Sequence, residues 1–322
     1  MSWKNIVGHE AVIRLLTGQL RKGRLPRAYL FAGQRGIGKG CLAAELAKVL
    51  ECEAPGKSGE EACDACQPCR QVTQDHHPDV KTISPESETG QIGIDQIRAV
   101  ARWMSLTPYG NGFKVAILDG ADRLTEQAVH ASLKLLEEPP QRALFLLIAS
   151  SLHGLPATLV SRCHVVRCVP QGIRRVAETL IEREQIPEVL SSMLACVSGG
   201  RLGLALTLKR TSALAEKNIA LDQLLTAWRQ NLAEVPLAQA PRVEIEESLE
   251  WLAAWWRDLL ILKLKGDPAW LIHQDRLEDL KKDLSPNEAS LLVQRVDRIY
   301  GVQEAIQRNA SPRIALAALL TR

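Results

Sequence analysis

The sequence predicts a parallel α/β domain of the phosphate-loop type, followed by an all-helical region. In the first half of the chain, short apolar runs alternate with segments of helical periodicity, the rhythm of a parallel sheet covered by helices. These runs lie at 28–32, 114–119 and 143–149. A glycine-rich loop follows the first run, and after about residue 170 strand-like runs disappear. We therefore expect the α/β domain to span 1–168.

Within that domain, the runs at 115–118 and 144–149 are almost continuously apolar. Strands with helices on both faces have this character, so these two are expected at the centre of the sheet. Helices are expected at 39–50 and 126–138.

The second half reads as helices at 171–184, 187–208, 216–233, 243–265 and 286–309. Two prolines in 234–241 predict a connector. In the last helix, one apolar stripe is expected from Ala289, Leu292, Val296, Ile299, Tyr300 and Ile306. Trp251, Trp255 and Trp256 suit a bundle core or a subunit interface. Acidic neighbours in 244–250 count against stacking on single-stranded DNA.

Composition limits the function classes. The 322 residues are 46% hydrophobic and 24% charged, as in globular proteins, and the net charge is +3. Such a small excess does not favour a protein that grips duplex DNA alone. Apolar runs long enough to cross a membrane and a secretion signal are absent, so we expect a cytoplasmic protein.

The segment Gly33-Gln-Arg-Gly-Ile-Gly38-Lys39 matches a phosphate-binding loop between a strand and a helix. Backbone N–H groups of this loop, with its glycines Gly33, Gly36 and Gly38, would cradle phosphates, and Lys39 would reach the outer ones. The next residue is Gly40, where the motif has the Ser or Thr that holds magnesium. The loop is therefore suited to a nucleotide but poorly to its metal. A plain glycine turn with a surface lysine is the alternative.

The run Lys114-Val-Ala-Ile-Leu-Asp119 matches the second nucleotide motif, in which an aspartate at a strand end positions magnesium. In an active ATPase of this type a glutamate usually follows, but position 120 is Gly. Together Gly40 and Gly120 predict slow or absent ATP hydrolysis. Asp119 as a simple turn cap is the alternative.

Four cysteines, Cys52, Cys63, Cys66 and Cys69, have the spacing of a structural zinc site. The polar loop between them, at about 51–70, would fold on the metal. Free thiols are the alternative, and His76 and His77 are candidate replacement ligands. We expect the other cysteines to be packing residues: Cys41, Cys163, Cys168 and Cys196.

Arg162 stands in Ser161-Arg-Cys163 after the run at 143–149. A planar, permanently charged guanidinium at a domain edge suits a phosphate on a neighbouring subunit. From these residues alone, a surface salt bridge is the favoured interpretation.

The chain resembles the clamp-loader ATPases of the AAA+ class, and within them the delta-prime subunits of bacterial DNA polymerase III. The similarity runs nearly from end to end. Besides the loop and the cysteines, it is carried by Trp3-Lys-Asn-Ile-Val-Gly-His-Glu10, Leu25-Pro-Arg-Ala-Tyr-Leu-Phe31, His77-Pro-Asp79, Ala121-Asp-Arg-Leu-Thr125, Leu135-Leu-Glu-Glu-Pro-Pro140, Leu155-Pro-Ala-Thr-Leu-Val-Ser-Arg-Cys163 and Asn309-Ala-Ser-Pro-Arg-Ile-Ala-Leu316.

This resemblance implies a five-subunit ring that opens a sliding clamp and closes it around primed DNA. The implied partners are motor subunits of the gamma/tau kind, a delta subunit and the clamp. Arg162 becomes an arginine finger that reaches the ATP of the adjacent motor subunit, which reverses the salt-bridge interpretation. The helical half divides into a lid at 169–208 and a collar at 209–322.

A third departure from the motor pattern is Gly203, where the family's second sensor has an arginine; Arg201 is the nearest substitute. We therefore predict a ring subunit that hydrolyses little or no ATP. Two rivals are a working motor subunit and a zinc-dependent nucleic-acid-binding module, against which the small net charge counts.

Overall fold

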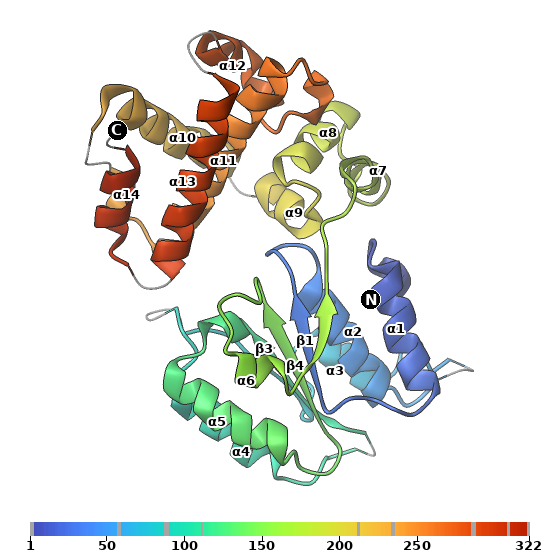
Figure 1. Ribbon diagram of the computed structural model, residues 1–322. Helices are drawn as coiled ribbons and strands as arrows, with labels where there is room; N and C mark the ends of the chain where they lie inside the picture. The colour runs from blue at the N-terminus through green and yellow to red at the C-terminus, as the bar shows by residue number, and fades with distance from the viewer. Residues whose placement is uncertain are drawn as a thin grey trace. The chain divides into compact units, whose positions relative to one another are not determined.

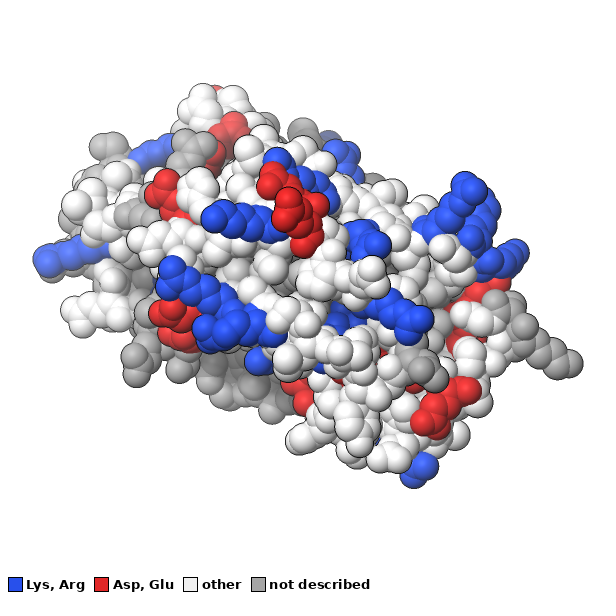
Figure 2. Space-filling view, turned by 90° about the horizontal axis from the view of Figure 1, so that it is seen from below, with Lys and Arg blue, Asp and Glu red and all other residues white. Residues whose placement is uncertain are grey.

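The computed structural model describes residues 3–56, 59–86, 90–110, 112–210, 213–232, 236–284, 288–307 and 310–320. The chain divides into two compact units, 1–171 and 172–322. Across these described ranges, every helix is too short or too polar to cross a bilayer. Basic side chains gather across the middle of the face drawn in Figure 2, with acidic ones beside several of them, in keeping with the net charge of +3.

The first unit is built on five parallel strands in the order β2-β3-β4-β1-β5. They are β1 (Ala28–Ala32), β2 (Val80–Ile83), β3 (Lys114–Asp119), β4 (Ala143–Ala149) and β5 (His164–Arg167). Every residue of β1 and β4 is buried. The three apolar runs are therefore confirmed as strands, and they occupy the centre of the sheet.

The two edge strands, β2 and β5, were not predicted. Both are four residues long, and exposed or half-buried residues interrupt their buried positions. An edge strand has one neighbour and partial solvent contact, so its sequence lacks the apolar run that marks a central strand.

Helices cover both faces of the sheet (Figure 1). They are α1 (Glu10–Arg21), α2 (Lys39–Glu51), α3 (Gln67–Thr73), α4 (Ile94–Met104), α5 (Glu126–Glu137) and α6 (Ala157–Val160). Because side chains alternate along a strand, Tyr29 and Phe31 pack with α1, α2 and α3, whereas Leu30 packs with α4, α5 and α6. The expected helices at 39–50 and 126–138 are confirmed.

The second unit is helical, as predicted. Its helices are α7 (Ile173–Glu184), α8 (Glu188–Val197), α9 (Leu202–Arg210), α10 (Ala213–Gln230), α11 (Arg242–Lys263), α12 (Leu277–Leu284), α13 (Ala289–Gln307) and α14 (Pro312–Leu320). The expected segment 187–208 is two helices, because Gly199 and Gly200 adopt positive φ of 58° and 79° between them. In the predicted connector, Pro236–Gln239 form a short 3-10 helix, and 233–235 lie outside the described residues.

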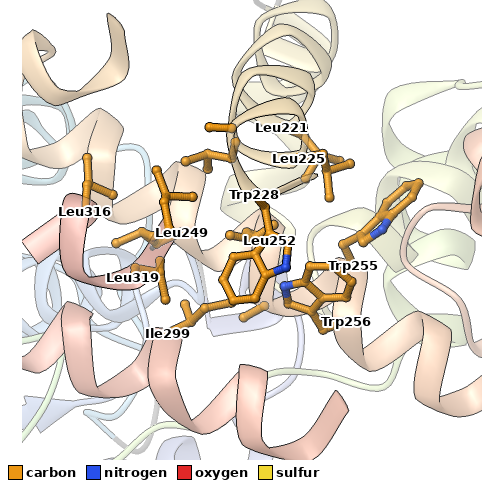
Figure 3. Close-up of a cluster of buried hydrophobic side chains, with 14 of the residues drawn as sticks. Leu221, Leu225, Trp228, Leu249, Leu252, Trp255, Trp256, Ile299, Leu316 and Leu319 are labelled. Carbon is orange, nitrogen blue, oxygen red and sulfur yellow. The ribbon is translucent and has the colours of Figure 1, made fainter. Parts of the chain in front are cut away.

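Buried apolar side chains of the second unit form two clusters. One joins α7, α8 and α9 with Trp251 of α11, and the other joins the helices from α10 onward. Trp255 and Trp256 belong to the second of these clusters (Figure 3). The ring centroids of Trp256 and Trp228 are 5.4 Å apart. These tryptophans are core residues, which favours the first of the two interpretations.

Two expectations about burial were wrong. Tyr300 is 56% exposed although Leu292, Ile299 and Ile306 of the same stripe are buried, because its position follows Ile299 directly and turns away from the core. Cys41 is exposed on α2, whereas Cys168 and Cys196 are buried and Cys163 is half-buried.

Candidate functional site

The glycine-rich loop turns sharply between β1 and α2. Gly33, Gly36 and Gly38 have φ values of 155°, 79° and 102°, which favour glycine. A Cβ on Gly33 would lie 2.2 Å from the carbonyl oxygen of Cys168, so no larger residue fits there. The sequence thus places glycines where the backbone conformation requires them.

Lys39, the first residue of α2, is held by the loop itself. Its ammonium donates to the carbonyl oxygens of Gly33 and Gln34, the latter at 2.7 Å. Only 5% of the residue is exposed, and this burial lowers the Lys39 pKa. A phosphate at this loop would have to take over these hydrogen bonds.

Two carboxylates and one histidine complete the surroundings of the loop. Burial is the main cause of the lowered Lys39 pKa, and attraction to Asp122 and Asp119 opposes it. Asp122 accepts hydrogen bonds from the Ser150 backbone N–H, at 3.1 Å, and from its hydroxyl. His9 Nε2 lies 2.7 Å from the Ile37 carbonyl oxygen. Asp119 was predicted here, whereas Asp122 and His9 were not, although both stand in segments that carry the family resemblance.

The two glycines that replace expected catalytic groups differ in their surroundings. A Cβ on Gly40 would meet no atom within 4 Å, so the site has room for a hydroxyl. Gly120 has φ 107°, and its Cβ would lie 3.1 Å from Pro85 Cγ. A side chain at 120 is therefore strained by the backbone conformation as well as by contact.

The four cysteines predicted as metal ligands come together after α2. Sγ atoms of Cys52 and Cys66 are 4.0 Å apart, and those of Cys63 and Cys69 are 3.9 Å apart. Thiolates ~2.3 Å from one tetrahedral ion would be separated by about this distance. All four ligand atoms lie within 4.8 Å of one another. The cluster could therefore bind a metal ion, and its all-sulfur donor set is consistent with zinc.

Local hydrogen bonds favour the thiolate of Cys63 in this cluster, whereas burial raises the pKa of Cys52 and of Cys69. The backbone N–H groups of Cys63 and Cys66 donate to Cys52 Sγ and Cys63 Sγ, each at 3.3 Å. Such N–H donors, from Cys66 first, lower the pKa of Cys63 to about 6, which favours the thiolate. Lys48 of α2 pairs with Asp64 and so ties the cysteine loop to the helix.

The end of α2 lies at the edge of the sheet opposite the glycine-rich loop. Glu51, its last residue, accepts a hydrogen bond of 2.8 Å from the Phe113 N–H, just before β3 begins. His77 is grouped with Glu51 and Asp79 rather than with the cysteines, and His76 is exposed. Neither histidine takes part in the cysteine cluster.

Arg162 lies between α6 and β5 with 34% of its side chain exposed. Its Nε donates to Glu137 Oε1 at 2.8 Å, its Nη2 donates to the same oxygen, and its Nη1 donates to the Thr158 carbonyl at 2.8 Å. The surface salt bridge predicted from the residues alone is therefore present. Sequence reasoning did not single out Glu137 as its partner.

The structure does not bring Arg162 to the loop of its own chain. β5 runs parallel to β1, and His164, its first residue, pairs with Tyr29 near the start of β1. Arg162 therefore lies at the amino edge of the sheet, whereas Gly33 and Lys39 follow the carboxyl end of β1. Arg162 therefore cannot contact a ligand bound at the glycine-rich loop of the same chain.

In the second unit, Gly203 lies in the first turn of α9. Arg201, the proposed substitute for the missing arginine, is engaged within that unit. It donates to the Ser198 carbonyl at 2.8 Å and to Glu250 at 3.1 Å.

Comparisons with known proteins agree with the resemblance. A family model described as DNA polymerase III, delta subunit, matches residues 8–171. DNA polymerase III subunit delta' of Bacillus subtilis is 28% identical over 319 residues, 96% of this chain and 93% of that protein. Subunit delta' of Pseudomonas aeruginosa is 30% identical over 79% of this chain and 76% of its own length. Subunit tau of Escherichia coli is 34% identical, but the match covers 64% of this chain and only 32% of that protein.

Among solved structures, a DNA polymerase III gamma subunit-related protein of Thermotoga maritima is similar over 97% of this chain and 96% of its own. It has 21% identity and a TM-score of 0.39. A DNA clamp loader delta protein of Bacillus subtilis covers 96% of this chain and 100% of its own, with 12% identity and a TM-score of 0.35.

Proposed function

We propose that the chain, which belongs to the DNA polymerase III delta-prime family of clamp-loader subunits, is a ring subunit. We further propose that it hydrolyses little or no ATP itself. In this role it supplies Arg162 in trans to the ATP site of an adjacent motor subunit. Its partners are gamma/tau and delta subunits, with the sliding clamp and primed DNA contacted through the assembled ring.

The observation that carries this proposal is the placement of Arg162. Its guanidinium is at the amino edge of the sheet, partly exposed, while the loop of the same chain follows the carboxyl edge. An arginine that serves phosphoryl transfer has to reach the transferring group directly. Arg162 therefore suits a nucleotide held by another subunit.

The loop supports the other half of the proposal. Gly40 lacks the hydroxyl that would hold magnesium, and Gly120 lacks the carboxylate that would orient water. The conformation of Gly120 resists restoration of that carboxylate. A nucleotide bound by Gly33, Gly36, Gly38, Lys39 and Asp119 would be a structural ligand without turnover.

The cysteine cluster is proposed to hold one structural zinc ion through Cys52, Cys63, Cys66 and Cys69. Four protein ligands close the coordination shell, so the metal would stabilise the loop without taking part in catalysis. We further propose that α7 to α9 form the lid and that α10 to α14 form the collar. The two apolar clusters of the second unit follow this division except at Trp251 of α11, which packs with α7 to α9.

The test is reconstitution with tau and delta subunits of one bacterium, followed by measurement of mass and of ATP turnover stimulated by clamp and primed DNA. The isolated chain is expected to show negligible turnover. Arg162→Ala should enter the assembly normally and lower turnover strongly at the site it faces, by about 10³-fold or more.

Arg174→Ala is the matched control, because Arg174 is an exposed arginine paired with Glu178. It should leave turnover unchanged. Robust hydrolysis by the isolated chain, or an Arg162→Ala assembly with full activity, would refute the proposal.

A further inference from the structure

Some N–H donors of the Arg162 guanidinium are hydrogen-bonded within the chain, and the others remain available to a partner. Among the described residues, three hydrogen bonds from the guanidinium reach Glu137 Oε1 and the Thr158 carbonyl oxygen. A guanidinium carries five N–H donors. The two that remain belong to the terminal nitrogens Nη1 and Nη2, at the end of the side chain.

Two elements fix the direction of this side chain. Glu137 is the last residue of α5 and holds Nε and Nη2, while Thr158 of α6 holds Nη1. An unrestrained arginine loses rotamer entropy when a partner fixes its side chain. Contacts on two sides restrict the rotamers before a partner arrives and leave one N–H donor on each terminal nitrogen for a charge-assisted hydrogen bond to a phosphate.

The position of Glu137 has no explanation within its own helix. The C-terminus of a helix carries a partial negative charge, where a carboxylate is unfavourable. Glu138 follows as the C-cap residue and adds a second acidic side chain. Glu137 accepts hydrogen bonds from Arg162 and forms an ion pair with it, and we attribute the placement of its carboxylate to that contact.

We infer that Glu137 is a positioning residue for Arg162: it holds the guanidinium with its terminal N–H donors directed outward, ready for the phosphates of a nucleotide on the adjacent subunit. This inference rests on the proposed function of Arg162 and adds a second residue to it. Glu137 acts through Arg162 and does not itself contact the nucleotide.

The experiment uses the reconstituted assembly with Glu137→Ala and Glu137→Gln. Without Glu137 the guanidinium samples more orientations, so we expect Glu137→Ala to lower kcat about tenfold with the KM for ATP unchanged. Glutamine keeps an acceptor oxygen for Nε, so Glu137→Gln should recover kcat to within about threefold of the wild type. The melting temperature should change little, because exposed ion pairs contribute little to stability.

Glu138→Ala is the matched control, since it removes the neighbouring exposed carboxylate and should leave kcat unchanged. Unchanged kcat in Glu137→Ala would overturn the inference. Higher kcat would overturn it too, because Glu137 would then be a restraint that competes with the phosphate. Arg162→Ala separates the two levels: if it is silent, the proposed function fails, and if it is inactive while Glu137→Ala is normal, only the positioning role fails.

Discussion

The two edges of the sheet in the first unit contrast sharply. At the carboxyl edge, the glycine-rich loop keeps its shape, but Lys39 is bonded to the loop's own carbonyls and Gly120 takes the place of a carboxylate. At the amino edge, Arg162 is partly exposed with free donors. The cysteine cluster follows the end of α2, whose 13 residues place it about 20 Å from the loop.

This difference supports the proposal that the chain does not hydrolyse ATP at the carboxyl edge and uses Arg162 at the amino edge. A parallel sheet separates the two edges by the length of its strands, so changes at Gly40 and Gly120 do not reach Arg162 or the cysteines. The carboxyl edge still contributes to the core of the fold, because Ile37 of the loop and Leu42 and Leu46 of α2 are buried there.

The largest expected contrast between the edges is functional. In the reconstituted assembly, Lys39→Ala should leave ATP turnover within about twofold of the wild type. Arg162→Ala should lower turnover at the ATP site that Arg162 faces by ~10³-fold, the effect of losing an arginine finger. Turnover measured at saturating ATP decides this. A Lys39→Ala assembly as inactive as the arginine variant would break the comparison, provided that its mass shows complete assembly.

The next effect concerns the cysteine cluster. Cys66→Ser should remove about one zinc ion per chain, because a structural site needs all four ligands. We expect the free energy of unfolding to fall by about 2 kcal/mol or more and the melting temperature to fall by roughly 5 °C. Metal analysis and thermal unfolding measure both. Cys41→Ser is the control, since Cys41 is exposed outside the cluster and should keep both metal and stability.

A smaller effect distinguishes the two glycines of the carboxyl edge, Gly40 and Gly120. Gly40→Ser should be neutral or stabilise by up to ~0.5 kcal/mol, because serine is a better helix former than glycine and the site is open. Gly120→Glu should destabilise by about 1–3 kcal/mol through its φ of 107°. Denaturant unfolding measures the two changes. The double variant is expected to remain inactive in ATP hydrolysis, and vigorous turnover would show that these two groups alone separate the chain from a motor.

The smallest effect is a pH dependence at the amino edge. His77 is buried, and its Nδ1 accepts a hydrogen bond of 3.1 Å from the Asp79 N–H. Burial lowers the His77 pKa in the folded protein, against the attraction of Asp79. The unfolded chain then binds the proton first as the pH falls below ~6.5, so stability is lost on acidification, by at most about 1.4 kcal/mol per pH unit.

Unfolding free energies at pH 7.5 and pH 5.5 test this. His77→Gln should reduce the loss of stability by about 1 kcal/mol, whereas His153→Gln, at an exposed position, should not. Equal pH dependence in the wild type and His77→Gln would contradict the assignment.

The sequence predicted the central strands, the helical second half and the grouping of the cysteines. Apolar runs as continuous as 144–149 need two helical layers, and Cys-x2-Cys spacing brings thiolates to one ion whatever the surrounding fold. Short edge strands such as β2 and β5 escaped prediction because their residues are partly exposed. Asp122 and His9 were also not predicted as part of the site, because their hydrogen bonds near the loop join chain segments that are far apart in sequence.

By itself, the sequence determined what the chain lacks: the hydroxyl at 40, the carboxylate at 120 and the arginine at 203 are absent whatever the fold. Only the tertiary structure decided that Gly120 cannot readily regain a side chain and that Arg162 is held by Glu137 on the edge away from the loop. Composition and spacing encode which groups exist, whereas backbone conformation and contacts between distant segments arise only when strands and helices pack together.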